Sequence, residues 1–205
     1  MREARPDGRD AGAEWTGELE KLLFLFHRKD GLSRDEFFEH YLEVHAPLGL
    51  RLTQNMDGYT VNLVDTEGAD APDAITEIWT ASAQDFFDPA KSFATADDAQ
   101  ELMTDHDSFI GPFVTYVVEE RVVRQGSDAA GAKRLSFYAD DAAVPEPGPG
   151  VTGIVEHRVV NVLGEGAKPY TSIVSTWAPT VDALGPASGV SYDVREYRKK
   201  LPPPA

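Results

Sequence analysis

The feature that most constrains this fold is the order in which strand and helix signals follow one another through the first half of the chain. Apolar or alternating runs predict four strands, and segments of helical periodicity lie between the first and second strands and between the third and fourth. The strands are predicted at residues 22–26, 58–64, 74–80 and 113–123. This β-α-β-β-α-β order is the plan of a ferredoxin-like unit.

The first predicted helix has a defined start and a defined apolar face. Ser33 and Glu36 form a capping box at its beginning. Its apolar stripe comprises Phe37, Phe38, Tyr41, Leu42, His45 and Leu48. Pro47 disfavours helical geometry in the residue before it, so we expect the helix to end close to His45.

Two helical segments follow the third strand. Ser82 with Asp85 predicts the start of a short helix that Pro89 stops, and Thr95 with Asp98 predicts the start of a longer one. The apolar positions of the longer helix are Ala99, Leu102, Met103, His106 and Ile110. These positions recur at helical spacing until a Gly-Pro pair ends the helix.

The second half of the chain echoes the first in a weakened form. Strands are predicted at residues 135–138, 153–163, 171–177 and 189–197. The third of these has Trp177 near its end, as the third strand of the first half has Trp79 near its end. Prolines and short spacings leave little room for helices between them. We therefore predict an α+β fold in which a strand-rich, degenerate ferredoxin-like unit packs sheet to sheet on the first unit. The alternative is two unrelated α+β pieces.

The predicted boundaries follow from composition. The unpatterned first residues indicate a flexible arm, a Gly- and Ala-containing segment indicates a linker, and a proline-rich end cannot continue a strand. The segments are an N-terminal arm at 1–17, a first unit at 18–124, a linker at 125–133, a second unit at 134–199 and a tail at 200–205.

Composition excludes several classes of partner and site. With 19 Lys+Arg against 35 Asp+Glu, the net charge of -16 argues against binding to nucleic acid or to an anionic membrane. The chain has no cysteine, which removes disulfides, thiolate metal sites and a cysteine nucleophile. No apolar run approaches the ~20 residues of a membrane helix, and phosphate-cradling, dinucleotide-binding and nucleophile-elbow motifs are absent. We expect a soluble, cytoplasmic protein.

Residues 26–48, FHRKDGLSRDEFFEHYLEVHAPL, resemble the opening signature of the EthD family, with its basic turn, Gly-Leu-Ser, Phe-bearing helix and His-Ala-Pro. Residues 104–109, TDHDSF, resemble the end of the second helix of that family. The resemblance implies a dimeric α/β barrel, which two chains usually form together. Because this chain appends its own second unit, a homodimer is only one option.

What the resemblance implies about activity is a range of chemistries. Family members include decarboxylases and dehydratases of aromatic polyketide intermediates, and the wider fold includes isomerases, cyclases, cofactor-free monooxygenases and haem proteins. Our hypothesis is a cofactor-independent dehydratase, cyclase, isomerase or decarboxylase that acts on a small apolar aromatic or polyketide-derived molecule. The alternatives are a non-catalytic protein that binds a small ligand and an oxygenase, because a fold alone does not determine function.

Four residues are the candidate catalytic groups. Tyr41 and His45 lie one helical turn apart on the apolar face, where His45 could move a proton that Tyr41 helps to orient. His27 follows Leu23 and Leu25 on one strand face, and Glu77 would be a base or histidine partner whose pKa burial raises. The simpler interpretations are a helix-terminal histidine for His45, a structural histidine for His27 and an edge-strand charge for Glu77.

Four further residues are candidate substrate contacts. Tyr59, Asn62 and Trp79 could stack on and hydrogen bond to a flat molecule, and His106 lies on the apolar stripe of its helix. Such residues are more often part of a core. The spacing of His27, His45, His106 and Glu77 is not diagnostic of a metal, so neither a metal nor another cofactor is predicted. His40 and His157 are predicted to be solvent exposed.

Overall fold

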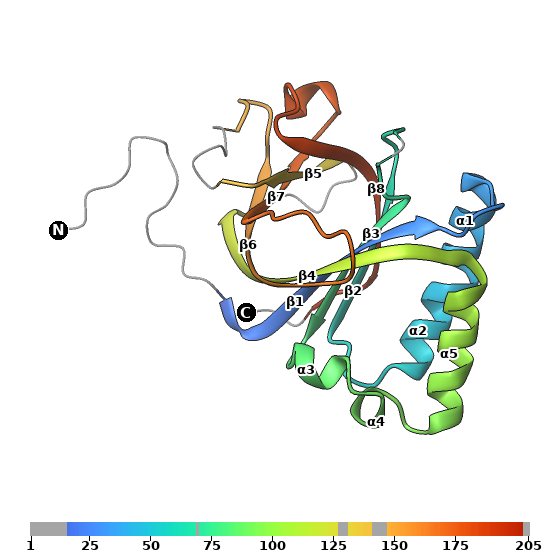
Figure 1. The fold of residues 1–205 in the computed structure, drawn as a ribbon. Coiled ribbons are helices and arrows are strands. Elements are labelled where there is room, and N and C mark those ends of the chain that lie inside the picture. Colours follow the sequence, from blue (N-terminus) through green and yellow to red (C-terminus); the bar gives the residue numbers. More distant parts are fainter. Residues whose placement is uncertain (1–15, 69, 127–130, 141–146, 203–205) are drawn as a thin grey trace.

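The computed structural model describes residues 16–68, 70–126, 131–140 and 147–202 (Figure 1). Most of the predicted N-terminal arm and part of the predicted linker lie outside these residues. Among the described helices, none is long and apolar enough to cross a membrane.

Eight strands close into one barrel in which all neighbouring strands are antiparallel. The strands are β1 (Thr16–Arg28), β2 (Gly58–Val64), β3 (Ala74–Thr80), β4 (Ile110–Arg124), β5 (Ala132–Tyr138), β6 (Gly153–Leu163), β7 (Ser172–Ala178) and β8 (Val190–Lys200). Their order around the barrel is β1-β3-β2-β8-β5-β7-β6-β4. The predicted α+β class and barrel type are therefore confirmed.

The two halves of the chain meet along their edges as well as across the barrel interior. β2 pairs with β8, and β4 pairs with β6, so the sheet from each half continues into the other. This pairing satisfies backbone groups that two stacked open sheets would leave at their edges. Two strands extend beyond the predicted boundaries. β8 ends inside the predicted tail, where Lys200 pairs with Tyr59 of β2, and β1 begins inside the predicted arm, where Thr16 pairs with Glu120 of β4.

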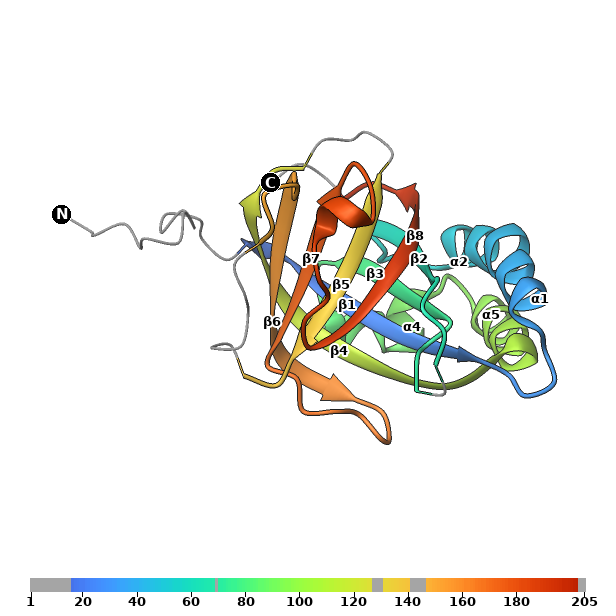
Figure 2. The ribbon, with the colours of Figure 1, turned by 90° about the horizontal axis from the view of Figure 1, so that it is seen from above.

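The α- and π-helices belong to the first half and cover one outer side of the barrel (Figures 1 and 2). They are α1 (Arg34–His40), the π-helical turn η1 (Tyr41–His45), α2 (Ala46–Leu52), α3 (Ala83–Phe86), α4 (Pro89–Ser92) and α5 (Ala96–Phe109), and the second half has the 3-10 turn η3 (Asp182–Leu184). The predicted capping box at Ser33 is present, and the predicted helix start at Thr95 also has a capping box, formed with Asp98.

Alternation along β1 gives the molecule two apolar compartments. Leu22, Phe24 and Phe26 pack under the helices, whereas Leu23 and Leu25 pack with side chains of the second half inside the barrel. This strand is therefore buried on both faces. Any candidate site residue on these strands therefore faces one compartment or the other, but not both.

The sequence predicted that the first helix ends close to His45, but the helix continues past this residue. It passes through η1, where the backbone N–H of Ala46 donates to the carbonyl of Tyr41 five residues earlier, and continues as α2 to Leu52. The widened turn places Pro47 in the first turn of α2, where a missing N–H costs little. The proline therefore changes the helical register and does not stop the helix.

Candidate functional site

A cavity of about 270 Å³ lies between the helices and the outer face of the barrel. Its walls are mostly aromatic and aliphatic, and the side chains at its mouth, Phe87, Met103 and Phe113, are exposed. The predicted site residues that line it are Tyr41, His45, Tyr59 and His106. Four of the eight candidates are thus brought together in one apolar cavity.

Asp105, on α5, is the partner of His45. Its Oδ2 lies 2.8 Å from Nδ1 of His45, and its Oδ1 lies 2.7 Å from Nε2 of His40. The sequence analysis did not select Asp105, although it lies within the family-like stretch at residues 104–109. His40, predicted to be solvent exposed, is only 31% exposed and is bound to this carboxylate.

The π-helical turn explains how two histidines reach one carboxylate. In a regular α-helix, side chains five positions apart point about 140° away from each other. The wider turn of η1 reduces that angle between His40 and His45. The ring of Phe109 packs against both imidazoles, at centroid distances of 4.5 Å and 4.9 Å, and holds them in place.

The contact with Asp105 determines which nitrogen of His45 can act as a base. Burial raises the pKa of Asp105, but the hydrogen bonds with His45 and His40 outweigh it, so the pKa lies below its ordinary value. The ionised carboxylate accepts a hydrogen bond from Nδ1–H of His45. Nε2 of His45 has no hydrogen-bond partner among the described residues, which leaves its lone pair for a ligand.

The other polar groups of the cavity are neutral. Burial, followed by the neighbouring His45, lowers the pKa of His106 to about 4, so this imidazole is uncharged at neutral pH. The hydroxyl of Tyr41 lies 2.6 Å from that of Thr76 and also contacts Tyr59. Burial raises the pKa of Tyr41 to about 12, so its hydroxyl keeps its proton and can donate a hydrogen bond.

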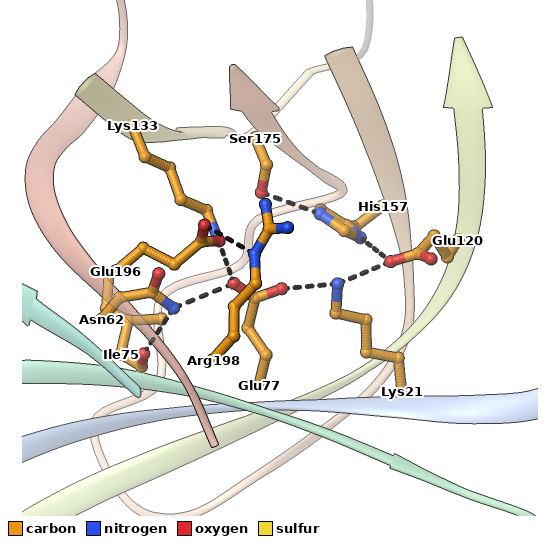
Figure 3. A network of polar contacts seen from close by, with 10 residues as sticks. All are labelled: Lys21, Asn62, Ile75, Glu77, Glu120, Lys133, His157, Ser175, Glu196 and Arg198. Atoms are coloured by element: carbon orange, nitrogen blue, oxygen red, sulfur yellow. Dashed lines mark hydrogen bonds and ion pairs between the residues drawn. The ribbon is translucent and has the colours of Figure 1, made fainter. Parts of the chain in front are cut away.

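Glu77 and Asn62 belong to a polar network inside the barrel (Figure 3). Trp79 shares the strand face of Glu77, and none of the three lines the cavity of His45. The carboxylate of Glu77 lies 2.6 Å from Nζ of Lys21 and also binds Nζ of Lys133. Nδ2 of Asn62 donates to Glu77 at 2.9 Å, and Nζ of Lys21 lies 4.1 Å from the ring centroid of Trp79. These candidates belong to a buried ionic network.

The expectation that burial would raise the pKa of Glu77 is wrong. Burial does act in that direction, but the charges of Lys133 and then Lys21 outweigh it and hold the pKa well below its ordinary value. A carboxylate held ionised by two ammonium groups is a weak proton acceptor.

His157 belongs to the same network, and the prediction that it is exposed is wrong. It is fully buried, with Nε2 3.0 Å from the hydroxyl of Ser175 and Nδ1 3.7 Å from the carboxylate of Glu120. Burial, followed by the nearby Lys21, lowers its pKa to about 3. β6 lies between two other strands of a closed barrel, so its inward side chains are shielded from solvent.

His27 lies in a different cavity, at the mouth of the barrel. The four residues considered as metal ligands, His27, His45, His106 and Glu77, are therefore not brought together. His45 and His106 are neighbours, with ring centroids 6.0 Å apart. Across the described ranges, no group of three or more His, Asp or Glu side chains has the arrangement of a metal site.

Comparisons with known proteins agree with this architecture. Residues 29–112 match the EthD domain family. An anthrone oxidase-like protein shares the fold, at 14% identity over 92% of this chain and 98% of that chain, with a TM-score of 0.56. A proposed monooxygenase from Fusobacterium nucleatum subsp. nucleatum is similar at 7% identity over 89% and 95%, with a TM-score of 0.50. No curated protein sequence is significantly similar to the chain.

Proposed function

Starting from an EthD domain at residues 29–112, we propose that this protein is an acid–base enzyme that removes a proton from a small, flat, largely apolar molecule. The observation that carries this proposal is the His45–Asp105 pair, which lies on the wall of an aromatic cavity. A histidine oriented by a carboxylate is a common general base at neutral pH. The proposal keeps the expectation of a reaction that needs no cofactor.

In the proposed step, Nε2 of His45 accepts a proton from the bound molecule. Asp105 holds the Nδ1–H tautomer and stabilises the imidazolium ion that forms. The electron pair left on the substrate moves onto a conjugated oxygen. Tyr41 and Tyr59 line the same cavity, and their hydroxyl groups would donate hydrogen bonds to that oxygen.

The size and lining of the cavity support an aromatic substrate. An apolar cavity of about 150 Å³ holds one benzene ring, so a cavity of about 270 Å³ has room for more than one ring. Phe24 and Phe26, which line the cavity from β1, form a stacked pair with ring centroids 5.4 Å apart. A flat, fused aromatic molecule would contact these rings over most of its area.

The second candidate is an oxygenase, and the names of the two solved structures favour it. A substrate carbanion formed by His45 could react with O₂ so that a methylene group becomes a carbonyl and water is released. In this reaction one O₂ molecule supplies the carbonyl oxygen and the oxygen of the water. The proton-abstraction step is the same in both candidates, and only the fate of the carbanion differs.

Anthrone is a suitable probe because it is flat and has an acidic methylene group. Without oxygen, exchange of that methylene with D₂O, followed by NMR, measures proton removal alone. With oxygen present, the consumption of O₂ and the formation of anthraquinone, in which the methylene group has become a second carbonyl, measure the oxygenase reaction. Exchange without oxygen consumption supports the lyase or isomerase class.

A third outcome would support the non-catalytic alternative. If anthrone raises the unfolding temperature equally in wild type and His45→Ala, and neither protein accelerates exchange, the cavity binds a ligand but performs no proton transfer. That result would contradict the proposed enzyme.

We further infer that each half of the barrel is a ferredoxin-like unit, with the second one degenerate. The strand orders β4-β1-β3-β2 and β8-β5-β7-β6 correspond position by position. Lys21 pairs with Trp79 across β1 and β3, as Lys133 pairs with Trp177 across β5 and β7. This correspondence supports two units, at residues 18–124 and 134–199. The cavity that contains His45 belongs to the first unit.

A further inference from the structure

A second cavity, of about 140 Å³, opens at the mouth of the barrel, near the end of β1. Tyr116, Tyr170 and Tyr192 line it from three different segments of the chain, and Leu25 and His27 line it from β1. Phe113 contributes to both cavities, but the histidine and tyrosine side chains of the helix-side cavity do not line this one.

Within the described part of the chain, two of the tyrosine hydroxyl groups in this cavity lack a hydrogen-bond partner. Tyr116 donates to the carbonyl of Lys168 at 3.0 Å. Among the described residues, no such partner exists for the hydroxyl of Tyr192, whose side chain is only 7% exposed, or for that of Tyr170. Both residues line the cavity, so their hydroxyl groups are available to donate to a bound molecule that accepts hydrogen bonds.

Aromatic rings form the wall behind these hydroxyl groups. The ring of Phe137 lies 5.3 Å from that of Tyr170 and 5.7 Å from that of Tyr192, and Tyr116 lies 6.0 Å from Tyr170. Such a wall offers stacking and edge contacts to a flat molecule. The volume of about 140 Å³ is close to the roughly 150 Å³ that holds one benzene ring, so the cavity accommodates a single ring.

The charges at the rim select against an anion. Asp70 and Glu165 line the cavity together with Lys168, whose ammonium group lies 4.0 Å from Asp70. Burial raises the pKa of Tyr192 to about 12, so its hydroxyl keeps its proton and can donate. Protonated donors beside a slightly acidic rim suit a neutral acceptor oxygen better than a carboxylate.

We propose that the barrel mouth is a second ligand site, distinct from the helix-side cavity, for an uncharged single-ring aromatic molecule that carries a carbonyl oxygen. Tyr192 and Tyr170 donate to that oxygen, and the ring packs on the aromatic wall. The site does not depend on the proposed proton transfer at His45.

The test is an NMR titration of the full chain with three small probes. Acetophenone carries the neutral carbonyl, benzoate carries an anionic group of similar size, and toluene has no acceptor. We expect acetophenone to bind with a dissociation constant of about 0.1–1 mM, to shift the resonances of residues lining the barrel mouth, and to bind more tightly than benzoate.

Two variants decide the assignment. Tyr192→Phe should weaken acetophenone binding by about fivefold to tenfold, as expected for one hydrogen bond, and should leave toluene binding unchanged. Val114→Phe fills the cavity and should abolish the binding of both, which keeps the test decisive if Tyr192→Phe fails to fold. His45→Ala is the matched control and should bind acetophenone as wild type does.

Three results would overturn the proposal. Acetophenone affinity that is unchanged in Tyr192→Phe would show that the hydroxyl does not contact the ligand. Affinity that is lost in His45→Ala would place the molecule in the helix-side cavity. Saturating acetophenone that shifts no resonance at the barrel mouth would show that no site exists there.

Discussion

Nδ1 of His45 lies 2.8 Å from Oδ2 of Asp105, across a contact between two helical segments, and the two residues are 60 positions apart in the chain. The carboxylate determines which nitrogen of the imidazole carries hydrogen, and so gives the other nitrogen the role of a base.

Asp105→Asn should lower the rate of proton removal by about 10²-fold or more, because an amide no longer stabilises the imidazolium ion. The substitution should lower kcat and leave KM within a few-fold of the wild-type value, because Asp105 does not line the cavity. Steady-state kinetics with the anthrone probe would measure it. Asp107→Asn is the matched control, because Asp107 lies two positions along the same helix and is 79% exposed. Equal activity in both variants would show that Asp105 has no catalytic influence.

Tyr41→Phe should reduce the rate by about tenfold to a hundredfold, because the cavity loses a hydroxyl that donates to the developing negative charge. The ring and its packing are retained, so the unfolding free energy should fall by only about 1 kcal/mol, the loss of the contact with Thr76. Parallel kinetics and chemical denaturation separate the two effects. A variant with full activity would show that the hydroxyl of Tyr41 has no catalytic role.

Glu77→Gln should destabilise the protein strongly and leave the chemistry intact. Lys21 and Lys133 are both buried, and the substitution removes the carboxylate that they share. Removing one partner of a buried ion pair costs about 3–5 kcal/mol. Urea denaturation would measure this loss, and activity well below the unfolding transition would remain near that of wild type. Lost activity in a stably folded variant would assign Glu77 to the active site instead.

Acidification should weaken the fold before its carboxylates titrate. His157 and His106 have folded-state pKa values of about 3 and about 4, below the 6.5 of an unperturbed histidine. The unfolded chain therefore binds more protons, so the stability from these groups is present above pH 6.5 and is lost as the pH falls towards the folded pKa values. Between pH 7 and pH 5, the protonation of each of these histidines should lower the free energy of unfolding by about 2 kcal/mol.

His157→Gln provides the check on this pH dependence. The amide can still contact Ser175 but cannot titrate. Comparing the unfolding free energies of wild type and variant at pH 7 and pH 5 should show about half of the pH dependence removed. An unchanged pH dependence would mean that His157 is not buried as a neutral ring.

The parts of this fold that local rules determine could be predicted from the sequence. The helix starts at Ser33 and Thr95 and the approximate strand positions follow from short patterns, and these elements are present. The strand ends differ because they depend on pairing with other strands. The prediction that the helix ends at His45 was wrong because the proline rule considers only neighbouring residues. The π-helical turn depends on how the whole helix packs against the sheet. Asp105 could not be assigned because its partners come from another helix.

Strand alternation is sufficient to divide the candidate residues between the two faces of the sheet. Tyr59 and Asn62 differ in parity on β2, so they point to opposite faces and cannot line one cavity. The same rule sets Glu77 apart from Thr76, which contacts Tyr41. Alternation does not predict which face a substrate would occupy, because both faces are covered in the closed barrel.

The most direct test of the central claim is the rate at which the anthrone methylene exchanges with D₂O, without oxygen, in wild type and in His45→Ala. We expect wild type to accelerate exchange over buffer and the variant to lose about 10²-fold to 10⁴-fold of that acceleration, while anthrone still protects both proteins against unfolding. Exchange in His45→Ala within a few-fold of wild type would contradict the assignment of His45 as the base.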